Sequence, residues 1–556
     1  MPMKSDIQIA KEAKMKHISE IGNILGIRED DLELYGKYKA KIPLDYIDNK
    51  KVDKSNLILV SAISPTPAGE GKTTMSIGLS QGLNKIGVNS SVVLREPSLG
   101  PVFGIKGGAT GGGLSQVLPM EDINLHFTGD FSAIEKAHNL LAALIDNAIQ
   151  QRTILIDPRT VLWKRVMDMN DRALRKNIVG LGGRTFGVPR ETGFDITAAS
   201  ELMAILCLAE DFEHLKEKLG NIFVGYTFDK KPVYARDLNA QGAMAALMRE
   251  AIKPNLVQTL EGTPAIIHGG PFANIAQGTN SVIATRAGMS MSDYVVTEAG
   301  FGFDLGAEKF FDIKCGYSGL SPKAVVLVAT ARALKYHGGA SLDKVNEPNM
   351  EALKKGVENL GKHIENIQTF NICAVVSINK FATDTEEELN FIKQYAEEKG
   401  VDAVVADVWG EGGEGAVDLA KKVKFVADNC QNKFKPMYDW EWSIPEKIEK
   451  VAKDVYGAAA IDYTSTAKSD LKKIEDLGYG KLPVCIAKTQ KSLSDNPKLI
   501  GRPKDFVVTV RQIELSAGAG FVVPITGNIM RMPGLPKHPA AEDIDVDKEG
   551  NITGLF

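Results

Sequence analysis

Short apolar runs alternate along the chain with segments that have the hydrophobic spacing of amphipathic helices. The first run covers residues 57–63, and a helix-like segment follows at 73–85. This alternation predicts βαβ units around a mainly parallel α/β sheet with helices on both faces. Further runs that end in a polar or glycine-rich turn lie at 90–94, 265–268, 294–296, 324–329, 372–378 and 403–406.

The turns after these runs carry polar, charged and aromatic side chains. Ligands of parallel α/β sheets bind beyond the carboxyl ends of the strands, so we expect the functional residues in these turns. The turns concerned are 95–97, 268–272, 297–300, 379–381 and 407–413.

The pattern changes from about residue 483 onwards. Runs at 506–515 and 520–525 there predict strands around a small glycine-containing turn. We therefore expect a separate β-containing unit at the C-terminal end of the sequence.

The turn after the first run has the composition of a phosphate-binding loop. Residues 66–74 read Thr-Pro-Ala-Gly-Glu-Gly-Lys-Thr-Thr. Backbone N–H groups and the start of the next helix would face the phosphates, Lys72 adds a point charge, and the Thr73 hydroxyl can hold Mg²⁺. We predict an ATP site formed by Thr66, Pro67, Ala68, Gly69, Glu70, Gly71, Lys72, Thr73 and Thr74.

One position departs from the usual phosphate-loop pattern, G-x-x-x-x-G-K-[ST], because Thr66 stands where glycine is expected. The alternative is a turn that only joins a strand to a helix. The apolar run before the loop and the helix-like segment after it favour phosphate binding.

Three other segments carry candidate chemistry. Arg95-Glu96 could grip a small carboxylate or acyl phosphate, or form a buried structural ion pair. The glycine-rich residues 104–113, with Lys106, allow close approach to an anion but are equally typical of a mobile turn. Residues 121–130 hold three carboxylates and His126, yet their spacing matches no metal motif and favours solvated turn residues.

Two aromatic residues each follow a predicted strand. Phe381 and Trp409 could stack on either side of a flat heterocycle, although aromatic residues more often fill cores. The preceding Asn379-Lys380 is similar to the guanine-reading motif of P-loop switches, but Ala382 stands where that motif has an acid. This disfavours a GTP-specific switch, but a P-loop switch or maturation ATPase whose nucleotide state controls a partner stays open as the competing class.

Composition narrows the class of protein. The 556 residues, with a net charge of −4 and 24% charged residues, indicate a multidomain globular protein and give no sign of nucleic-acid binding. No 18-residue apolar run or secretory signal is visible, so we expect a cytoplasmic protein without a membrane segment. The five scattered cysteines are typical of reduced thiols and lack a metal-ligand spacing.

With these residues in place, the chain resembles the formate–tetrahydrofolate ligase family, also called 10-formyltetrahydrofolate synthetases, over nearly its whole length. The chain differs from the family's signatures at Thr110, Leu114 and Ala331, which bears on local packing and affinity rather than on the reaction. The matching segments are 33–40, 65–74, 94–101, 120–130, 189–195, 268–276, 532–536 and 552–556.

The resemblance implies ATP-dependent ligation of formate to tetrahydrofolate in one-carbon metabolism, through formyl phosphate, by a homotetramer that uses Mg²⁺ and a monovalent cation such as K⁺ or NH₄⁺. It implies catalytic roles for Lys72, Arg95 and Glu96, with Arg95 on formate and Glu96 near the cation. Phe381 and Trp409 would sandwich the pterin. The resemblance also places Ser516, Ala517 and Gly518 at the nucleotide base.

We expect three domains on this basis. Residues 1–310 would bind the nucleotide and formyl phosphate, 311–440 would form a second α/β domain that contributes the folate site, and 441–556 would form the C-terminal domain. The residue that accepts the proton of the folate amine is left open among His126, His268 and Asp130.

Overall fold

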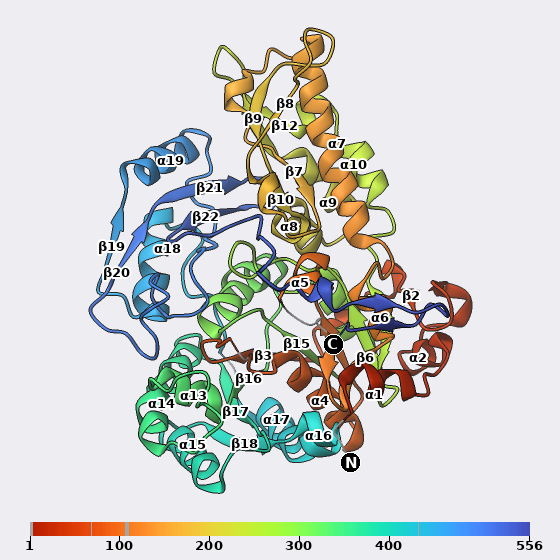
Figure 1. Ribbon diagram of the computed structural model, residues 1–556, viewed down its shortest axis with the longest axis vertical. Helices are drawn as coiled ribbons and strands as arrows, with labels where there is room; N and C mark the ends of the chain where they lie inside the picture. The colour runs from red at the N-terminus through yellow and green to blue at the C-terminus, as the bar shows by residue number, and fades with distance from the viewer. Residues whose placement is uncertain (1–3, 68, 106–109, 432, 556) are drawn as a thin grey trace.

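A computed structural model describes residues 4–67, 69–105, 110–431 and 433–555 (Figure 1). Its centre is a 12-stranded sheet in the order β1-β2-β13-β14-β4-β15-β3-β16-β17-β18, to which β6 and β5 add through β13. The predicted α/β class with a mainly parallel sheet is confirmed. The strands of the parallel part are β14 (Pro264–Ile267), β4 (Ser90–Leu94), β15 (Tyr294–Glu298), β3 (Asn56–Ala62), β16 (Ala324–Ala329), β17 (Cys373–Asn379) and β18 (Asp402–Ala406).

Side chains of β3 alternate between two cores, as a strand covered on both faces requires. Leu57 and Leu59 belong to the core that includes helix α14 (Met350–Thr369), whereas Ile58 and Val60 belong to the core that includes α4 (Lys72–Lys85) and α17 (Val417–Asn429). The helices that pack around the sheet also include α11 (Val282–Met291), α13 (Ala331–His337) and α15 (Glu386–Glu398).

The antiparallel edge of the sheet brings the N-terminal residues beside a glycine-rich turn. Strand β13 (Asn255–Thr259) pairs with β2 (Ala40–Lys41) and with β6 (Ser115–Leu118). Strand β6 pairs with β5 (Gly111–Gly112), and β2 pairs with β1 (Glu33–Leu34). Short helices α1 (Asp6–Glu12), α2 (Ile18–Ile24) and α6 (Met120–Asn124) contact this edge, whereas α3 (Asn49–Val52) packs against α11 and α5 (Leu99–Phe103) packs against residues 540–542.

A helical lobe rises from the sheet at the top of Figure 1. Its longest helix is α7 (Asp130–Gln151), which packs with α8 (Glu201–Leu208), α9 (Phe212–Gly220) and α10 (Gln241–Leu247) around a separate core. Three two-stranded sheets decorate the lobe: β7 (Arg165–Met167) with β10 (Phe194–Ile196), β8 (Asn177–Val179) with β9 (Arg190–Thr192), and β11 (Phe223–Tyr226) with β12 (Pro232–Tyr234).

The C-terminal part forms several small sheets, as the change of pattern after residue 483 predicts. The run at 506–515 is two strands in different sheets and not one, because residues 507–510 pair with 460–463 whereas residues 512–516 pair with 521–525. The elements are α18 (Ile444–Val451), β19 (Ala460–Tyr463), α19 (Ser465–Asp476), β20 (Val507–Val510), β21 (Gln512–Ser516), β22 (Phe521–Ile525), β23 (Asp545–Val546) and β24 (Ile552–Thr553).

The division into residues 1–310, 311–440 and 441–556 stays a prediction. The large sheet continues across the first of these boundaries, since β16 pairs directly with β3. The expectation of five reduced cysteines is wrong for one pair, because the return of α17 brings Cys430 to the start of β17, where it forms a disulfide with Cys373. Cys207, Cys315 and Cys485 are free and buried. Among the described residues, no helix has the length and apolarity to span a bilayer.

Candidate functional site

The phosphate loop joins β3 to α4, and a hydrogen bond between two of its own residues spans it. The carboxylate of Glu70, which is buried, accepts a hydrogen bond from the backbone N–H of Thr66 at 2.7 Å. Gly69 and Gly71 have φ of +74° and +77°, a region that strongly favours glycine, whereas Thr66 is absent from the described residues with positive φ. Threonine is therefore compatible with the first position of this loop. Ala68 lies outside the described residues.

Asn379, at the end of β17, contacts the phosphate loop. Its Nδ2 donates to the carbonyl of Glu70 at 3.1 Å, and a Cβ on Gly71 would lie 2.6 Å from the same nitrogen. The asparagine that resembles part of a guanine-reading motif in sequence thus packs on the phosphate loop itself.

Glu298 connects the phosphate loop to Arg95. Its buried carboxylate accepts a hydrogen bond from Thr73 Oγ1 at 2.8 Å, and its other oxygen lies 3.6 Å from Arg95 Nη2. The sheet order explains this meeting, because β15, which ends at Glu298, lies between β3 and β4. Glu298 lies in one of the turns predicted to be functional, but the sequence pattern indicates no role for it.

The guanidinium of Arg95 is only partly used by the protein. Besides Glu298, its Nη1 donates to the carbonyl of Pro271 at 3.4 Å, and its buried Nε has no hydrogen-bond partner in the described residues. Gly300 makes room for this group, since a Cβ there would lie 2.8 Å from Nη1. The arrangement leaves a donor of a planar fork available for an anion.

Glu96 is a buried carboxyl group beside another acid. Its backbone N–H donates to Gly269 O at 2.8 Å, but its Oε2 has no hydrogen-bond partner in the part of the chain that is described. Burial raises its pKa well above the usual value and the charge of Asp130 raises it further, against the opposing effect of Lys41. Lys41 itself is committed to Asp130, with Nζ–O distances of 2.6 and 2.8 Å.

The three candidate proton acceptors lie in different environments. His268 is fully buried, its ring nitrogens lie 2.6 Å from Ser281 Oγ and 2.6 Å from Ala251 O, and burial lowers its pKa to about 4. Asp130 is held by Lys41 and accepts a bond from Asn255 at 2.7 Å, whereas His126 is exposed. Both ring nitrogens of His268 are therefore occupied by the fold.

Phe381 and Trp409 follow neighbouring strands, β17 and β18, and one face of each ring is covered. The guanidinium of Arg332 lies 3.5 Å from the centroid of Phe381. The indole of Trp409 lies against the glycine turn, residues 111–113, where a Cβ on Gly113 would approach ring atoms to 2.7 Å. Arg332 had no predicted role, although it lies in a segment compared with a family signature. Lys106 lies outside the described residues.

Ser516, Ala517 and Gly518 lie at the turn between β21 and β22, against the helical lobe. The N–H groups of Gly518 and Ala519 donate to Glu201 Oε1 at 2.7 and 3.2 Å. A Cβ on Gly518 would lie within 2.9 Å of atoms of Lys218, Ile222 and Ile205. A role of this turn in binding the nucleotide base stays a prediction.

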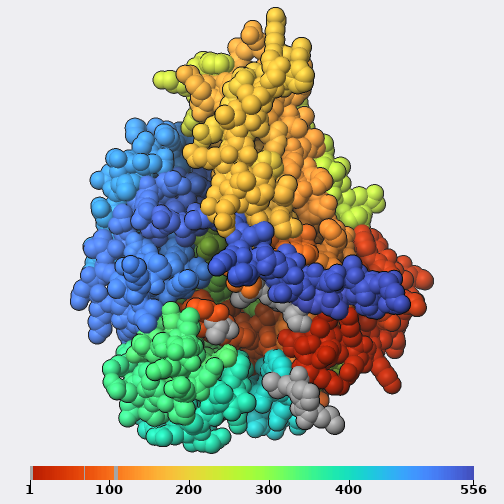
Figure 2. Space-filling view, in the orientation of Figure 1, coloured from red at the N-terminus to blue at the C-terminus, as the bar shows by residue number. Residues whose placement is uncertain are grey.

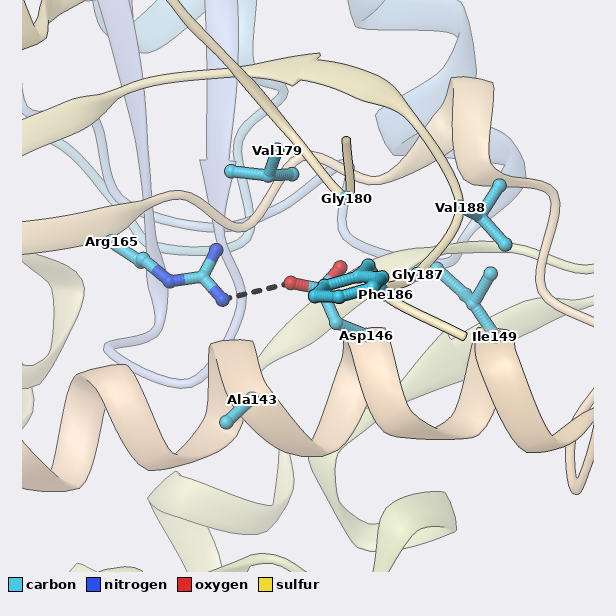
Figure 3. A pocket seen from close by; sticks show the side chains of 9 residues that line it. All are labelled: Ala143, Asp146, Ile149, Arg165, Val179, Gly180, Phe186, Gly187 and Val188. Carbon is cyan, nitrogen blue, oxygen red and sulfur yellow. Dashed lines mark hydrogen bonds and ion pairs between the residues drawn. The ribbon is translucent and has the colours of Figure 1, made fainter. Parts of the chain in front are cut away.

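Two cavities lie apart from these residues. One, of about 290 Å³, lies between α7 and the β8–β9 hairpin, where Arg165 pairs with Asp146 at 2.8 Å (Figure 3). The other, of about 270 Å³, lies between the helical lobe and the C-terminal unit and is lined by Lys164, Asp195, Glu514 and Arg531 among others. In the second cavity Lys164 pairs with Asp195, and Arg531 pairs with Glu514.

The carboxyl group of Glu201 generates a pH prediction. Burial raises its pKa from 4.5 to about 7, although the N–H groups of Ala519 and Gly518 oppose the rise. The folded protein then binds more protons than the unfolded chain between these values, so this contribution to stability is present below pH 4.5 and is lost as pH rises through 7. Between pH 5 and 8, we expect the free energy of unfolding of Glu201→Gln to exceed that of wild type by an amount that grows with pH to about 3 kcal/mol. Denaturant unfolding at several pH values measures this difference.

An amide at this position keeps an acceptor for the two N–H groups and removes the titration. Parallel pH profiles of wild type and variant would contradict the assignment of the pKa shift to Glu201.

A comparison with known families completes the description of the site. The model of the family described as formate–tetrahydrofolate ligase matches residues 4–556. The chain belongs to this family, which confirms the resemblance inferred from sequence and decides against a P-loop switch. It is an ATP-dependent ligase that formylates tetrahydrofolate.

Proposed function

We propose that this ligase first transfers the γ-phosphoryl group of ATP to formate and then passes the formyl group to N10 of tetrahydrofolate. The observation that carries the proposal is the link from Thr73 through Glu298 to Arg95. Because of it, the turn that binds phosphates and the guanidinium available to a small anion belong to one cluster.

The chemistry explains why two steps are needed. Formate is a poor electrophile because its carboxylate is anionic. In the first step a formate oxygen attacks the γ-phosphorus, and the bond to the bridging oxygen of ADP breaks, which gives formyl phosphate. In the second step N10 attacks the formyl carbon, phosphate leaves with the electron pair of the C–O bond, and the amine loses its proton.

Residues 66–74 are the proposed nucleotide cradle. The N–H groups of the loop and the N-terminal end of α4 would neutralise charge on the phosphate oxygens, together with Lys72. Thr73 and Glu298 would hold a Mg²⁺ ion, since one offers a hydroxyl and the other a buried carboxylate. Bound there, the ion would supply further neutralisation of the phosphate charge.

Arg95 is the proposed grip on formate and on formyl phosphate. Its Nε has no partner in the described residues, and its Nη groups are already oriented by Glu298 and Pro271. A guanidinium held in this way can receive an anion without losing much conformational freedom.

Glu96 is the proposed neighbour of the monovalent cation. Its Oε2 is buried and has no partner among the described residues, and its pKa is raised, so a negative charge there is not fully compensated by the protein alone. A bound K⁺ or NH₄⁺ would supply that compensation and favour the ionised carboxylate. Glu96 fits a monovalent cation because its Oε2 is a buried oxygen ligand without a hydrogen-bond partner among the described residues.

Phe381 and Trp409 are the proposed pterin platform. They follow adjacent parallel strands, and Arg332 and the glycine turn leave the opposite face of each ring for a flat ligand. The family resemblance also supports a nucleotide-base role for Ser516, Ala517 and Gly518, a homotetramer, and a cytoplasmic location.

The first prediction from the proposed function tests the phosphate loop. Lys72→Ala removes a charge that faces the phosphates, so kcat for 10-formyltetrahydrofolate formation should fall on the order of 100-fold or more. Lys85→Ala, at the other end of α4 and half-exposed beside Glu261, is the matched control and should keep wild-type turnover. Near wild-type turnover of Lys72→Ala would place the nucleotide elsewhere.

The second prediction tests the grip on formate. Arg95→Lys keeps the charge but loses the planar fork, so turnover should fall on the order of 100-fold while the Kd of tetrahydrofolate stays within about twofold. Product formation and ligand titration measure the two effects. Arg159→Lys, at an exposed arginine that pairs with Asp157 in the helical lobe, serves as control. Equal loss of folate binding would make Arg95 a structural residue.

The third prediction tests the folate platform. Tetrahydrofolate should quench the intrinsic fluorescence of the protein, which has four tryptophans. Trp409→Ala should abolish most of this quenching and weaken folate binding roughly tenfold, because a stacking surface is lost. Trp442→Phe, at a partly exposed tryptophan of the C-terminal unit, should leave both unchanged. Unaltered folate binding by Trp409→Ala would overturn the proposed platform.

A further inference from the structure

The N-terminal helix α1 is attached to the glycine turn by hydrogen bonds from both sides of that turn. Asp6 Oδ1 accepts the N–H of Gly113 at 2.8 Å, and the Asp6 carbonyl accepts Nε2 of Gln116 at 3.0 Å. Nε2 of Gln116 also donates to the carbonyl of Gly113 at 2.9 Å. One residue of α1 thus closes a small network around the turn.

The same turn supports Trp409 through its backbone and its surface. The N–H of Leu114 donates to the Trp409 carbonyl at 2.9 Å. Gly113 has φ of +57°, and a Cβ there would lie 2.0 Å from that carbonyl oxygen and 2.7 Å from the indole. Only glycine fits this contact, so the indole lies directly against the backbone of the turn.

The far end of α1 is anchored as well. Lys11 Nζ donates to the carbonyl of Ile552 in β24 at 2.7 Å and lies 3.4 Å from Glu121 in α6. Figure 2 shows the C-terminal residues crossing to the N-terminal region. Ser5 caps the first turn of the helix in a capping box with Gln8. The helix therefore holds Asp6 between two fixed points.

We propose that Asp6 is a positioning residue for folate, which acts through the glycine turn on the indole of Trp409. This inference rests on the proposed role of Trp409 in the pterin platform. A glycine turn has wide conformational freedom unless its N–H groups are held, and the carboxylate of Asp6 supplies a charge-assisted bond that holds Gly113. Without that bond, folate would have to order the turn and the indole when it binds.

The experiment is steady-state kinetics of the full-length protein with varied tetrahydrofolate or ATP. Asp6→Ala should raise the KM for tetrahydrofolate on the order of tenfold, with kcat at saturating folate and the KM for ATP within about twofold of wild type. Asp6→Asn keeps an oxygen acceptor without the charge and should give an intermediate KM. Glu12→Gln is the matched control, since this exposed carboxylate of the same helix pairs only with Lys4 among the described ion pairs.

A double-mutant comparison separates positioning from general destabilisation. In a Trp409→Ala background, Asp6→Ala should change folate binding less than about twofold, because its effect runs through the missing indole. Full additivity of the two substitutions, or an equal rise in the KM for ATP, would overturn the inference. If Trp409→Ala itself leaves folate binding unchanged, the proposed platform fails. If Trp409→Ala weakens folate binding but Asp6→Ala leaves it unchanged, the platform stands and the positioning role of Asp6 fails.

Discussion

The buried carboxylate of Glu298 is the interaction on which the arrangement of the site depends. A buried carboxylate is costly unless it is hydrogen-bonded or paired, and here the Thr73 hydroxyl and the Arg95 guanidinium satisfy it. Those partners follow the strands on either side of its own, since Arg95 comes directly after β4 and Thr73 lies at the start of α4, which the phosphate loop joins to β3. The need to satisfy one charge therefore holds the start of α4 and the end of β4 in a single geometry, and ATP and formate would be brought together by it.

Protein contacts also hold the two aromatic rings in place. Phe381 is covered by the guanidinium of Arg332, and Trp409 by the backbone of Gly113, so each ring is oriented by the protein before a ligand arrives. A platform held in advance loses less conformational entropy on binding. The supports come from α13 and from the glycine turn, and α1 holds that turn in its place. The proposed folate side of the site would thus depend on segments that lie far apart in the sequence.

The buried carboxyl group of Glu96, by contrast, lacks full compensation of its negative charge by the protein. Lys41 pairs with Asp130 and also donates to the carbonyl of Lys253, and Glu96 is left buried with a raised pKa. The helical lobe shows the same principle at Glu201, where two backbone N–H groups offset burial only in part. Such groups cost stability when ionised, which is consistent with a place for a cation at Glu96 and with a structural role at Glu201.

The amino-acid sequence by itself determined the features that depend on neighbours along the chain: the alternation of strands and helices, the loop at 66–74, and the positions of Arg95, Phe381 and Trp409 at strand ends. These follow from local periodicity and from turn chemistry. Tertiary structure alone decided which strand ends meet. Glu298 and Thr73 are 225 residues apart, Asp6 and Gly113 are 107 apart, and Cys373 and Cys430 are joined across 57. Alternation specifies that strands are parallel and buried but not their order in the sheet, because every buried apolar strand presents nearly the same surface to a neighbour. Long-range packing of the helices chooses that order, and with it the partners of each functional side chain.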